Sequence, residues 1–201
     1  IYFEKSSVKY DLFQKDKINA VRHGDTNFKK ILGHRYESIF IGSNTNTVIE
    51  GGKKINSYHN YFIGKDSTNW KSRVPLYSEI KYIDVYKNID VKYYSSGGKL
   101  KYDFTIYPKA SPENIKIKYV GIDSIYIKSG HLILKTSLGN VIEQAPLAYQ
   151  VINERKQTIP CEYKLKNDIV SFKLKKKYDQ NYDLVIDPLL IFSTYSGSSA
   201  N

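Results

Sequence analysis

Apolar and polar residues alternate along most of this sequence, and the three-to-four-residue spacing of an amphipathic helix is nearly absent. Successive side chains of a β-strand point to opposite faces, so a period of two is typical of strands with one buried face. Turn-forming residues separate the alternating runs. The sequence therefore predicts an all-β fold: an antiparallel β-sandwich of many short strands with little or no helix. Strands are expected at residues 8–12, 36–41, 80–83, 89–94, 100–106, 115–120, 125–128, 131–136, 141–143, 148–152, 161–165, 170–174 and 184–186.

The best-supported element is a hairpin in the middle of the chain. Residues 89–94 and 99–106 both alternate, and the Ser-Ser-Gly-Gly stretch 95–98 between them favours a turn because glycine readily adopts positive φ. We expect these two runs to pair with each other.

Other segments are expected to lack regular strand structure. Helix is expected only as single turns, near residues 66–70 and 111–114. Residues 43–57 contain Gly51-Gly52 and several Asn and Ser residues, so we expect a long loop there.

The chain has 201 residues, of which 41% are hydrophobic, and this is enough to bury a core of its own. We expect residues 1–188 to form the β-sandwich domain and residues 189–201 to form a junction strand and linker toward a downstream module. Val185-Ile186 is the expected last core strand, because Pro188 lacks an N–H and favours an extended exit from the sheet. Residues 189–195 are expected at a sheet edge.

The ends and the hydropathy of the sequence bear on its context. The sequence begins at Ile1 within an alternating pattern and contains no Met, so we expect an internal segment whose start, with any signal peptide, lies upstream. No run of 18 apolar residues is present, so no helix is expected to span a membrane.

Lys and Arg number 31 against 20 Asp and Glu, which gives a formal net charge of +11. Such a surface can attract nucleic acid, anionic lipid or acidic polysaccharide. Base and phosphate contacts favour the planar guanidinium, yet arginine is scarce. The arginines are Arg22, Arg35, Arg73 and Arg155. Lysines alternate along 116–118 and 164–166, so we expect solvated sheet faces, no specific nucleic-acid partner, and polyanion binding that is weak and sequence-independent.

No metal-binding or nucleophilic motif is present. The four histidines, His23, His34, His59 and His131, lack the spacing of a metal site. The single cysteine, Cys161, excludes an internal disulfide and is expected to be a small buried hydrophobe. We therefore assign no catalytic, metal-binding or cofactor-binding residues, and expect no cofactor and no enzyme activity.

Four carboxylates are the remaining candidates for chemistry: Asp84, Asp90, Asp103 and Asp187, which lie in or beside expected strands. Two of them could converge for glycosidic acid–base chemistry, or several could hold calcium. No Asp-x-Asp-x-Asp-Gly loop is present, so turn capping or pairing with Lys is the expected role.

Trp70, Lys71 and Arg73 are the candidates for a surface or ligand site, because an aromatic side chain and two cations meet there in an expected loop. Exposed aromatic rings can stack on sugars or bases, but most of the 19 Tyr and 8 Phe are expected to pack in the core. We predict that Trp70 folds back beneath Val74-Pro75 and packs against the body of the domain.

A set of residues in fixed order and spacing resembles a known family. The set comprises Tyr61-Phe62-Ile63-Gly64, Trp70, Val74-Pro75, Tyr77, Val85-Tyr86, Ile89-Asp90, Tyr93-Tyr94, Leu100, Tyr102-Asp103-Phe104, Pro108, Pro112, Gly121, Pro146, Tyr149-Gln150, Val185-Ile186-Asp187-Pro188 and Ser193-Thr194-Tyr195. From Tyr36 to the end, the chain resembles the amino-terminal domain of unknown function of bacterial SBBP-repeat (beta-propeller repeat) surface proteins. The usual Asn-x-Gly-Gln segment is missing, and Ser196-Gly197-Ser198-Ser199 replaces the usual Leu-Gly-Gly-Ser.

The resemblance implies a secreted or cell-surface bacterial protein with propeller repeats after the Asp187-Pro188 junction. In Bacteroidota such proteins often carry a type IX secretion sorting domain. The expected function is therefore that of a non-catalytic extracellular module, which mounts or caps downstream domains and contributes to adhesion or surface assembly. Its expected partners are those domains, and polysaccharide or other surface proteins are further possibilities. The alternatives are a carbohydrate-binding module and, third, a glycoside hydrolase using an Asp pair.

Overall fold

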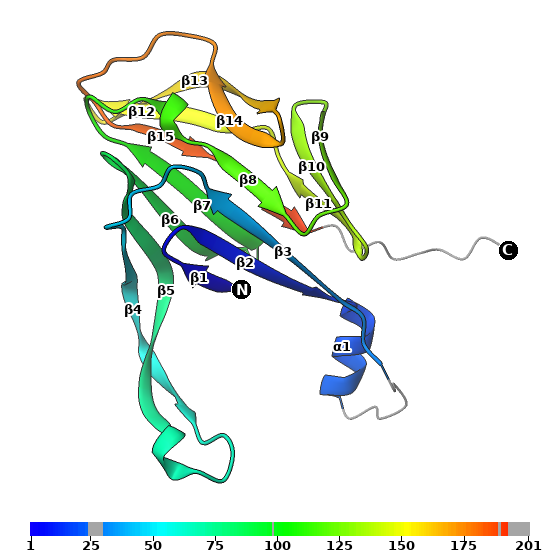
Figure 1. The fold of residues 1–201 in the computed structure, drawn as a ribbon. Coiled ribbons are helices and arrows are strands. Elements are labelled where there is room, and N and C mark those ends of the chain that lie inside the picture. The colour runs from blue at the N-terminus through cyan, green and yellow to red at the C-terminus, as the bar shows by residue number, and fades with distance from the viewer. Residues whose placement is uncertain (24–29, 98, 189, 193–201) are drawn as a thin grey trace, which may run out of the picture.

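The computed structural model describes residues 1–23, 30–97, 99–188 and 190–192, and it confirms the all-β antiparallel fold (Figure 1). The amino-terminal part contains β1 (Tyr2–Glu4), β2 (Ser7–Phe13), α1 (Lys15–Arg22), β3 (Gly33–Phe40), β4 (Val48–Tyr61), the 3₁₀ turn η1 (Ser67–Asn69), β5 (Lys71–Tyr86), β6 (Ile89–Ser96) and β7 (Lys99–Ile106). The carboxy-terminal part contains the 3₁₀ turn η2 (Pro112–Asn114), β8 (Ile117–Val120), β9 (Ser124–Lys128), β10 (His131–Thr136), β11 (Gly139–Glu143), β12 (Leu147–Ile152), β13 (Arg155–Lys166), β14 (Ile169–Leu174), β15 (Leu184–Asp187) and β16 (Leu190–Phe192).

One long strand connects the two layers of the sandwich. The strands form a sheet in the order β1-β2-β3-β8-β14-β13-β12-β15-β7-β6-β5-β4 and a smaller sheet in the order β16-β11-β10-β9. The first half of β13 pairs with β12, and its second half, from Cys161 onward, pairs with β14. The large sheet folds over at this strand, so that β2, β3 and β8 lie in front of β5, β6 and β7 (Figure 1).

The core between the layers consists largely of aromatic rings. Phe40 of β3 lies 6.4 Å from Phe104 of β7, measured between ring centroids, and Phe3 of β1 lies 5.3 Å from Tyr93 of β6. Tyr82 of β5 is fully buried, and its hydroxyl donates a 3.1 Å hydrogen bond to the backbone oxygen of Ser7. Edge-to-face contacts of this kind add about 0.5–1.5 kcal/mol per pair to the free energy of area burial.

A buried carboxylate joins the small sheet to the large one. Glu143 of β11 is 2% exposed, and Tyr102 of β7 and Tyr119 of β8 each donate a 2.6 Å hydrogen bond to it. Tyr163 of β13 donates a third, at 3.3 Å. Burial raises the pKa of Glu143, and the three hydroxyl donors act in the opposite direction.

The hairpin predicted around residues 95–98 is confirmed. β6 pairs with β7 from Ile89 opposite Ile106 to Ser96 opposite Lys99, and Gly97 has the expected positive φ of 59°. Residue 98 lies outside the described residues. The two predicted helical turns are also present, as η1 and η2.

Two sequence-based predictions were wrong. Residues 43–57 are not one long loop, because β4 begins at Val48 and includes Gly51-Gly52. Those glycines make room for side chains of β5: a Cβ at Gly51 would lie 2.4 Å from the Tyr77 ring, and one at Gly52 would lie 2.5 Å from Glu79. The eight-residue helix α1 was also not expected, since it is short and half of its residues are charged.

Two strands at the carboxyl end of the described chain lie where strands were expected. β15 is a core strand, with Leu184 and Ile186 fully buried, and Val185 lies between them. After Pro188, β16 pairs with β11 at the edge of the small sheet. Most of the predicted linker, residues 193–201, lies outside the described residues.

Candidate functional site

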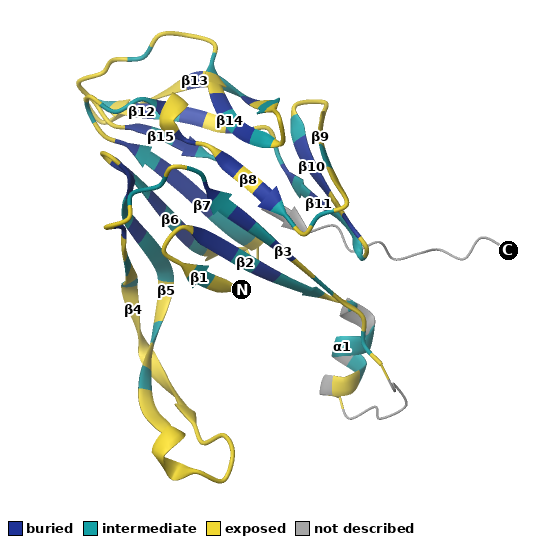
Figure 2. Ribbon diagram, viewed as in Figure 1, coloured by how far each residue is buried: buried dark blue, intermediate teal, exposed yellow. Residues whose placement is uncertain are grey.

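The most prominent surface feature is a two-stranded arm formed by β4 and β5, here defined as residues 52–78. β5 pairs with β6 only from Tyr86 to Glu79, so the described chain supplies no third strand beyond Glu79. β4 and β5 nevertheless continue to pair as far as Tyr61 opposite Lys71. The arm therefore extends away from the sandwich, and it is exposed along most of its length (Figure 2).

The tip of the arm is an ordered loop around Trp70. The carboxylate of Asp66 accepts hydrogen bonds from the backbone N–H of Thr68, at 3.0 Å, and from its hydroxyl, at 2.7 Å. The indole N–H of Trp70 donates to the backbone oxygen of Gly64, and the ring packs edge-on against Phe62 at 5.4 Å. Trp70 is 42% exposed. The prediction that it packs against the body of the domain was wrong, because the continued pairing of β4 and β5 carries it away.

The other two candidate residues lie beside Trp70 on the arm. Lys71 opens β5 opposite Tyr61. Arg73 has a φ of 54°, and its backbone N–H donates to the side-chain oxygen of Asn60 at 2.8 Å. Arg73 thus lies at an irregularity of the ribbon, where the pairing register shifts and the strand twists. The three predicted residues are therefore neighbours on one exposed tip, and their ligand-binding role remains a prediction.

The arm carries large apolar side chains that are exposed to solvent. The exposed members are Ile55, Tyr58, Tyr61, Phe62, Ile63, Trp70 and Tyr77, with exposed fractions between 41% and 74%. The arm also carries four lysines and Arg73 against a single acid, Asp66. This surface is both apolar and cationic.

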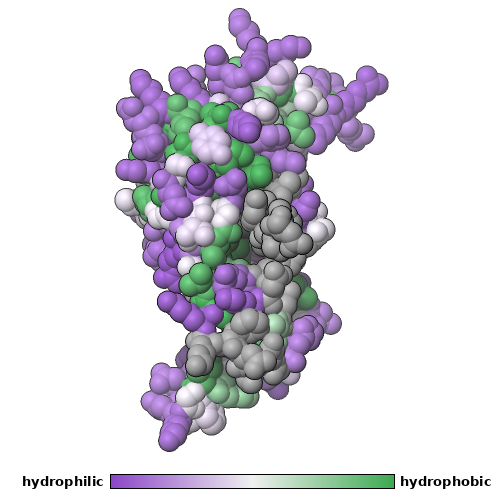
Figure 3. Space-filling view, turned by 90° about the vertical axis from the view of Figure 1, so that its right-hand side faces the viewer, coloured by the Kyte–Doolittle hydropathy of each residue, from purple (hydrophilic) through white to green (hydrophobic). Residues whose placement is uncertain are grey.

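A second feature is a groove that is lined by lysines at the other end of the sandwich. The groove has a volume of about 1160 Å³. Its lining includes lysines from β13, from β14 and the segment after it, and from the position just before β8: Lys116, Lys164, Lys166, Lys173, Lys175, Lys176 and Lys177. Ser111, Pro112 and Glu113 of the η2 region complete one side. In Figure 3, which views the molecule from the side of β9–β11, hydrophilic side chains project around this upper end.

A buried amide holds one side of this groove in place. Gln150 of β12 is 2% exposed, and its side-chain N–H groups donate to the backbone oxygens of Asp179, at 2.7 Å, and Tyr182, at 3.0 Å. Its side-chain oxygen accepts from the backbone N–H of Asp179 at 2.9 Å. These bonds fix the segment that follows Lys175–Lys177, so the three lysines lie on an anchored stretch of chain.

The four candidate aspartates form two pairs. Asp90 accepts a 2.7 Å hydrogen bond from the backbone N–H of Asp84, and Asp84 accepts from the N–H of Asn88, so these two stabilise the β5–β6 turn. Asp103 and Asp187 lie on the neighbouring strands β7 and β15. Burial raises the pKa of Asp103, and the negative charge of Asp187 adds to the effect.

Asp103 is engaged by side chains of β6. The Tyr94 hydroxyl donates to it at 3.2 Å, and Lys92 lies 3.6 Å away. One oxygen of Asp187 is buried without a hydrogen-bond partner among the described residues. Asp103 and Asp187 were both predicted candidates, and the structure brings them together on adjacent strands. The contacts of Asp103 are those of a packed sheet face.

A family model described as a domain of unknown function, DUF7948, matches residues 1–189. The chain belongs to this family. Comparison with curated proteins and with solved structures gives no match. The family match runs from β1 to β15, so the sandwich, the arm and the lysine groove are all parts of the DUF7948 domain.

The remaining candidates for chemistry in this DUF7948 domain are separated from one another. His34 contacts Ser137, whereas His131 accepts the backbone N–H of Ala145. In the described residues no three His, Cys, Asp or Glu side chains are grouped as they would be for a metal ion. Cys161 is partly buried against the core, and burial raises its pKa to about 12, which disfavours the nucleophilic thiolate. No described helix is long and apolar enough to cross a membrane.

Proposed function

We propose that this domain is a non-catalytic module of a multidomain extracellular protein, and that its arm docks onto the domain that follows in the same polypeptide. The observation that carries the proposal is the arm itself, a ribbon of two strands with seven large apolar side chains exposed. A two-stranded ribbon is at best marginally stable in water, and contiguous exposed apolar surface marks an interaction site. Docking would stabilise the ribbon and cover that surface.

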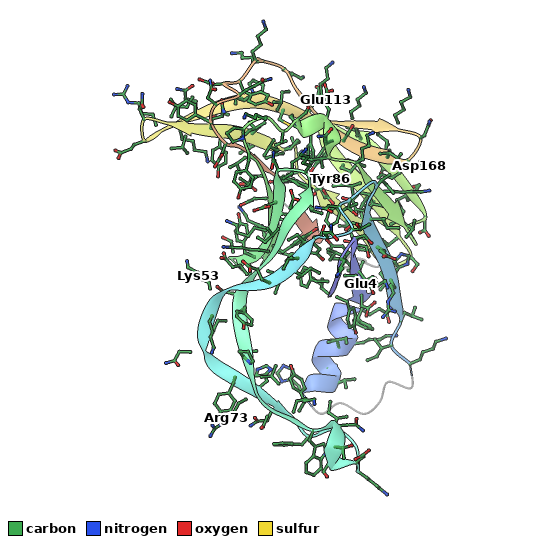
Figure 4. All side chains as sticks on the ribbon, turned by 60° about the vertical axis from the view of Figure 1, so that its left-hand side comes forward. Glu4, Lys53, Arg73, Tyr86, Glu113 and Asp168 are labelled. Carbon is green, nitrogen blue, oxygen red and sulfur yellow. The ribbon has the colours of Figure 1, made fainter. Side chains whose placement is uncertain are left out.

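The chemistry of the arm indicates the kind of surface it fits. Tyrosine and tryptophan bury large areas with little loss of side-chain entropy and are enriched at interfaces. With four lysines and Arg73 against Asp66 alone, the arm is complementary to a surface with an apolar centre and an acidic rim. The arm and α1 project from the same end of the sandwich in Figures 1 and 4, so one neighbouring domain could contact both.

The resemblance to SBBP-repeat proteins supplies the finer part of the proposal. On that basis the following domain is a beta-propeller, and the whole protein is a secreted or cell-surface protein of Bacteroidota, exported by type IX secretion. The module would mount or cap the propeller and contribute to adhesion or surface assembly. Its location outside the cell and its partners belong to this proposal.

The two alternatives have weaker support at the predicted residues. A sugar-binding platform needs rings that present a flat face, whereas Phe62 and Trp70 meet at an interplanar angle of 66°. A glycoside hydrolase needs an acid and a nucleophile or base, free to act on substrate. Asp84 and Asp90 are occupied by turn hydrogen bonds, and Asp103 contacts Tyr94 and Lys92.

Hydrogen exchange tests the docking proposal. Amide exchange is compared between this chain alone and a longer native polypeptide that includes the next domain. We expect amides of residues 52–78 to exchange more slowly in the longer polypeptide, because docking covers the ribbon. Equal exchange in the two would overturn the proposal.

A pair of variants locates the contact. Phe62→Ala with Trp70→Ala is expected to abolish the added protection and to leave the unfolding temperature of the isolated chain unchanged, because neither ring contacts the core. Tyr126→Ala on β9 removes a comparably exposed aromatic ring from the body and is expected to leave the protection intact. Loss of protection in the Tyr126 variant alone would place the interface elsewhere.

A further inference from the structure

The lysine groove carries a clear excess of positive charge. Seven lysines line it, and Glu113 is the one acid among its lining residues. Glu162, just outside, forms ion pairs with Lys175 at 2.6 Å and with Lys173 at 4.0 Å. The side chains of the other five lysines have no ion-pair partner in the described chain. Concave surfaces lined by charges of one sign focus the electrostatic potential and attract counter-ions.

The groove lysines come from three separate segments of the chain. Lys164 and Lys166 both lie on the outer face of β13, two residues apart, which separates them by about 7 Å. Lys176 and Lys177 precede the segment held by Gln150, and Lys116 directly precedes β8. Ser111, Ser171 and Asn167 supply polar groups between them. A row of cations on an open groove suits an extended ligand with a charge at each repeat, and it suits a single phosphate less well.

The geometry points to a binding site for an acidic polysaccharide in this groove. Lysine gives single-point contacts with carboxylate or sulfate groups, and the hydroxyl and amide groups can bind sugar hydroxyls. Single-stranded nucleic acid is bound by aromatic stacking platforms together with cations. The aromatic residues of the lining are Phe172, which is buried, and Tyr178, which is half buried, so base stacking is poorly supported.

This site is independent of the proposed docking of the arm. The arm and the groove share no residue, and they lie at opposite ends of the molecule in Figures 1 and 4. The two proposals can therefore fail separately.

Binding of the whole chain to polygalacturonate tests the inference. Binding is measured by calorimetry or thermophoresis at about 0.15 M salt, where interactions between exposed charges are screened beyond about 8 Å. Uncharged dextran and a single-stranded thymidine oligonucleotide of matched charge serve as comparison ligands. We expect saturable binding to polygalacturonate, weaker binding to the oligonucleotide and none to dextran. Absence of polygalacturonate binding, or binding of the oligonucleotide that is equal or tighter, overturns the inference.

Matched variants separate the groove from the overall charge. The triple substitution Lys164→Gln, Lys166→Gln and Lys176→Gln is compared with Lys65→Gln, Lys128→Gln and Lys135→Gln, which removes the same charge from exposed positions outside the groove. We expect the groove variant to weaken binding about tenfold or more and the control variant to weaken it less than about threefold. Equal losses in both would show attraction to net charge alone and would refute a groove site.

Discussion

Replacing Glu143 with Gln is expected to make folding stability less sensitive to pH. Glu143 is the buried carboxylate that accepts hydrogen bonds from Tyr102, Tyr119 and Tyr163. Ionising Glu143 in the core costs several kcal/mol of lost solvation free energy. Each hydroxyl that donates a hydrogen bond to the charged group offsets about 1.5–3 kcal/mol of that cost. The raised pKa shows that burial outweighs the donors.

The direction of the effect follows from that raised pKa. Above the ordinary glutamate pKa of 4.5, Glu143 loses its proton in the unfolded chain but keeps it in the folded one, up to its raised folded pKa. Its stabilising contribution is therefore complete below pH 4.5 and is lost as the pH rises through the folded pKa. The loss is at most about 1.4 kcal/mol for each pH unit within that window. Gln keeps the shape and can accept or donate to the same hydroxyls without titrating.

Urea unfolding, followed by circular dichroism at several pH values between 4 and 8, measures this effect. The free energy of unfolding of Glu143→Gln minus that of the wild type is expected to increase as the pH rises above 4.5. Glu162→Gln is the control, because Lys175 lowers the pKa of the partly exposed Glu162, so its contribution to stability changes only below about pH 4.5 and its difference is expected to stay nearly constant from there to pH 8. A difference for Glu143→Gln that is constant, or that decreases with rising pH, would refute the reasoning.

Three further predictions concern packing, backbone and boundary. Tyr119→Phe is expected to reduce the free energy of unfolding in urea by about 1.5–3 kcal/mol above the folded pKa of Glu143, where its hydroxyl donates to a charged carboxylate. Tyr82→Phe is expected to reduce it by about 1 kcal/mol, because that hydroxyl donates to a backbone carbonyl; equal losses would contradict this. Gly121→Ala is expected to lower the unfolding temperature more than Gly42→Ala does. Both glycines have positive φ, but only at Gly121 would a Cβ lie 2.7 Å from a backbone oxygen of β3. A chain ending at Pro188 is expected to unfold at a similar temperature, and a loss of several kcal/mol would place β16 in the core.

The period-two alternation predicted most strands because burial on one face is a local property of the sequence. Residues 131–136 and the hairpin at 95–98 followed that pattern closely. The extent of β4 and β5 was not predictable in this way, since nothing local shows where the third strand ends. Gly51-Gly52 indicated a loop by composition, whereas they lie in a strand beneath Tyr77 and Glu79.

The candidate sites depended on contacts that are distant in the sequence. Lys164 and Lys166 were correctly placed on a solvated face, but only the folding of β8, β13 and β14 gathers seven lysines around one groove. The burial of Glu143 could have been predicted from the sequence. Glu143 lies two residues after Val141, so both side chains point to the same, buried face of β11. An ionisable residue in the apolar phase of a strand indicates a buried polar network.

The positions of the arm and the groove bear on what such a domain can do in a larger protein. The arm presents apolar rings with a few cations, whereas the groove presents lysines and hydroxyls, and the sandwich separates the two (Figures 1 and 4). Contacts dominated by apolar burial change little with ionic strength, but contacts between exposed charges weaken steeply as salt rises. Salt therefore distinguishes the two surfaces in one sample: protection of the arm by a neighbouring domain should persist at about 0.5 M salt, and polysaccharide binding in the groove should be lost there. Since neither surface uses residues of the other, a module with this layout can hold a neighbouring domain at one end while the other end remains free to bind.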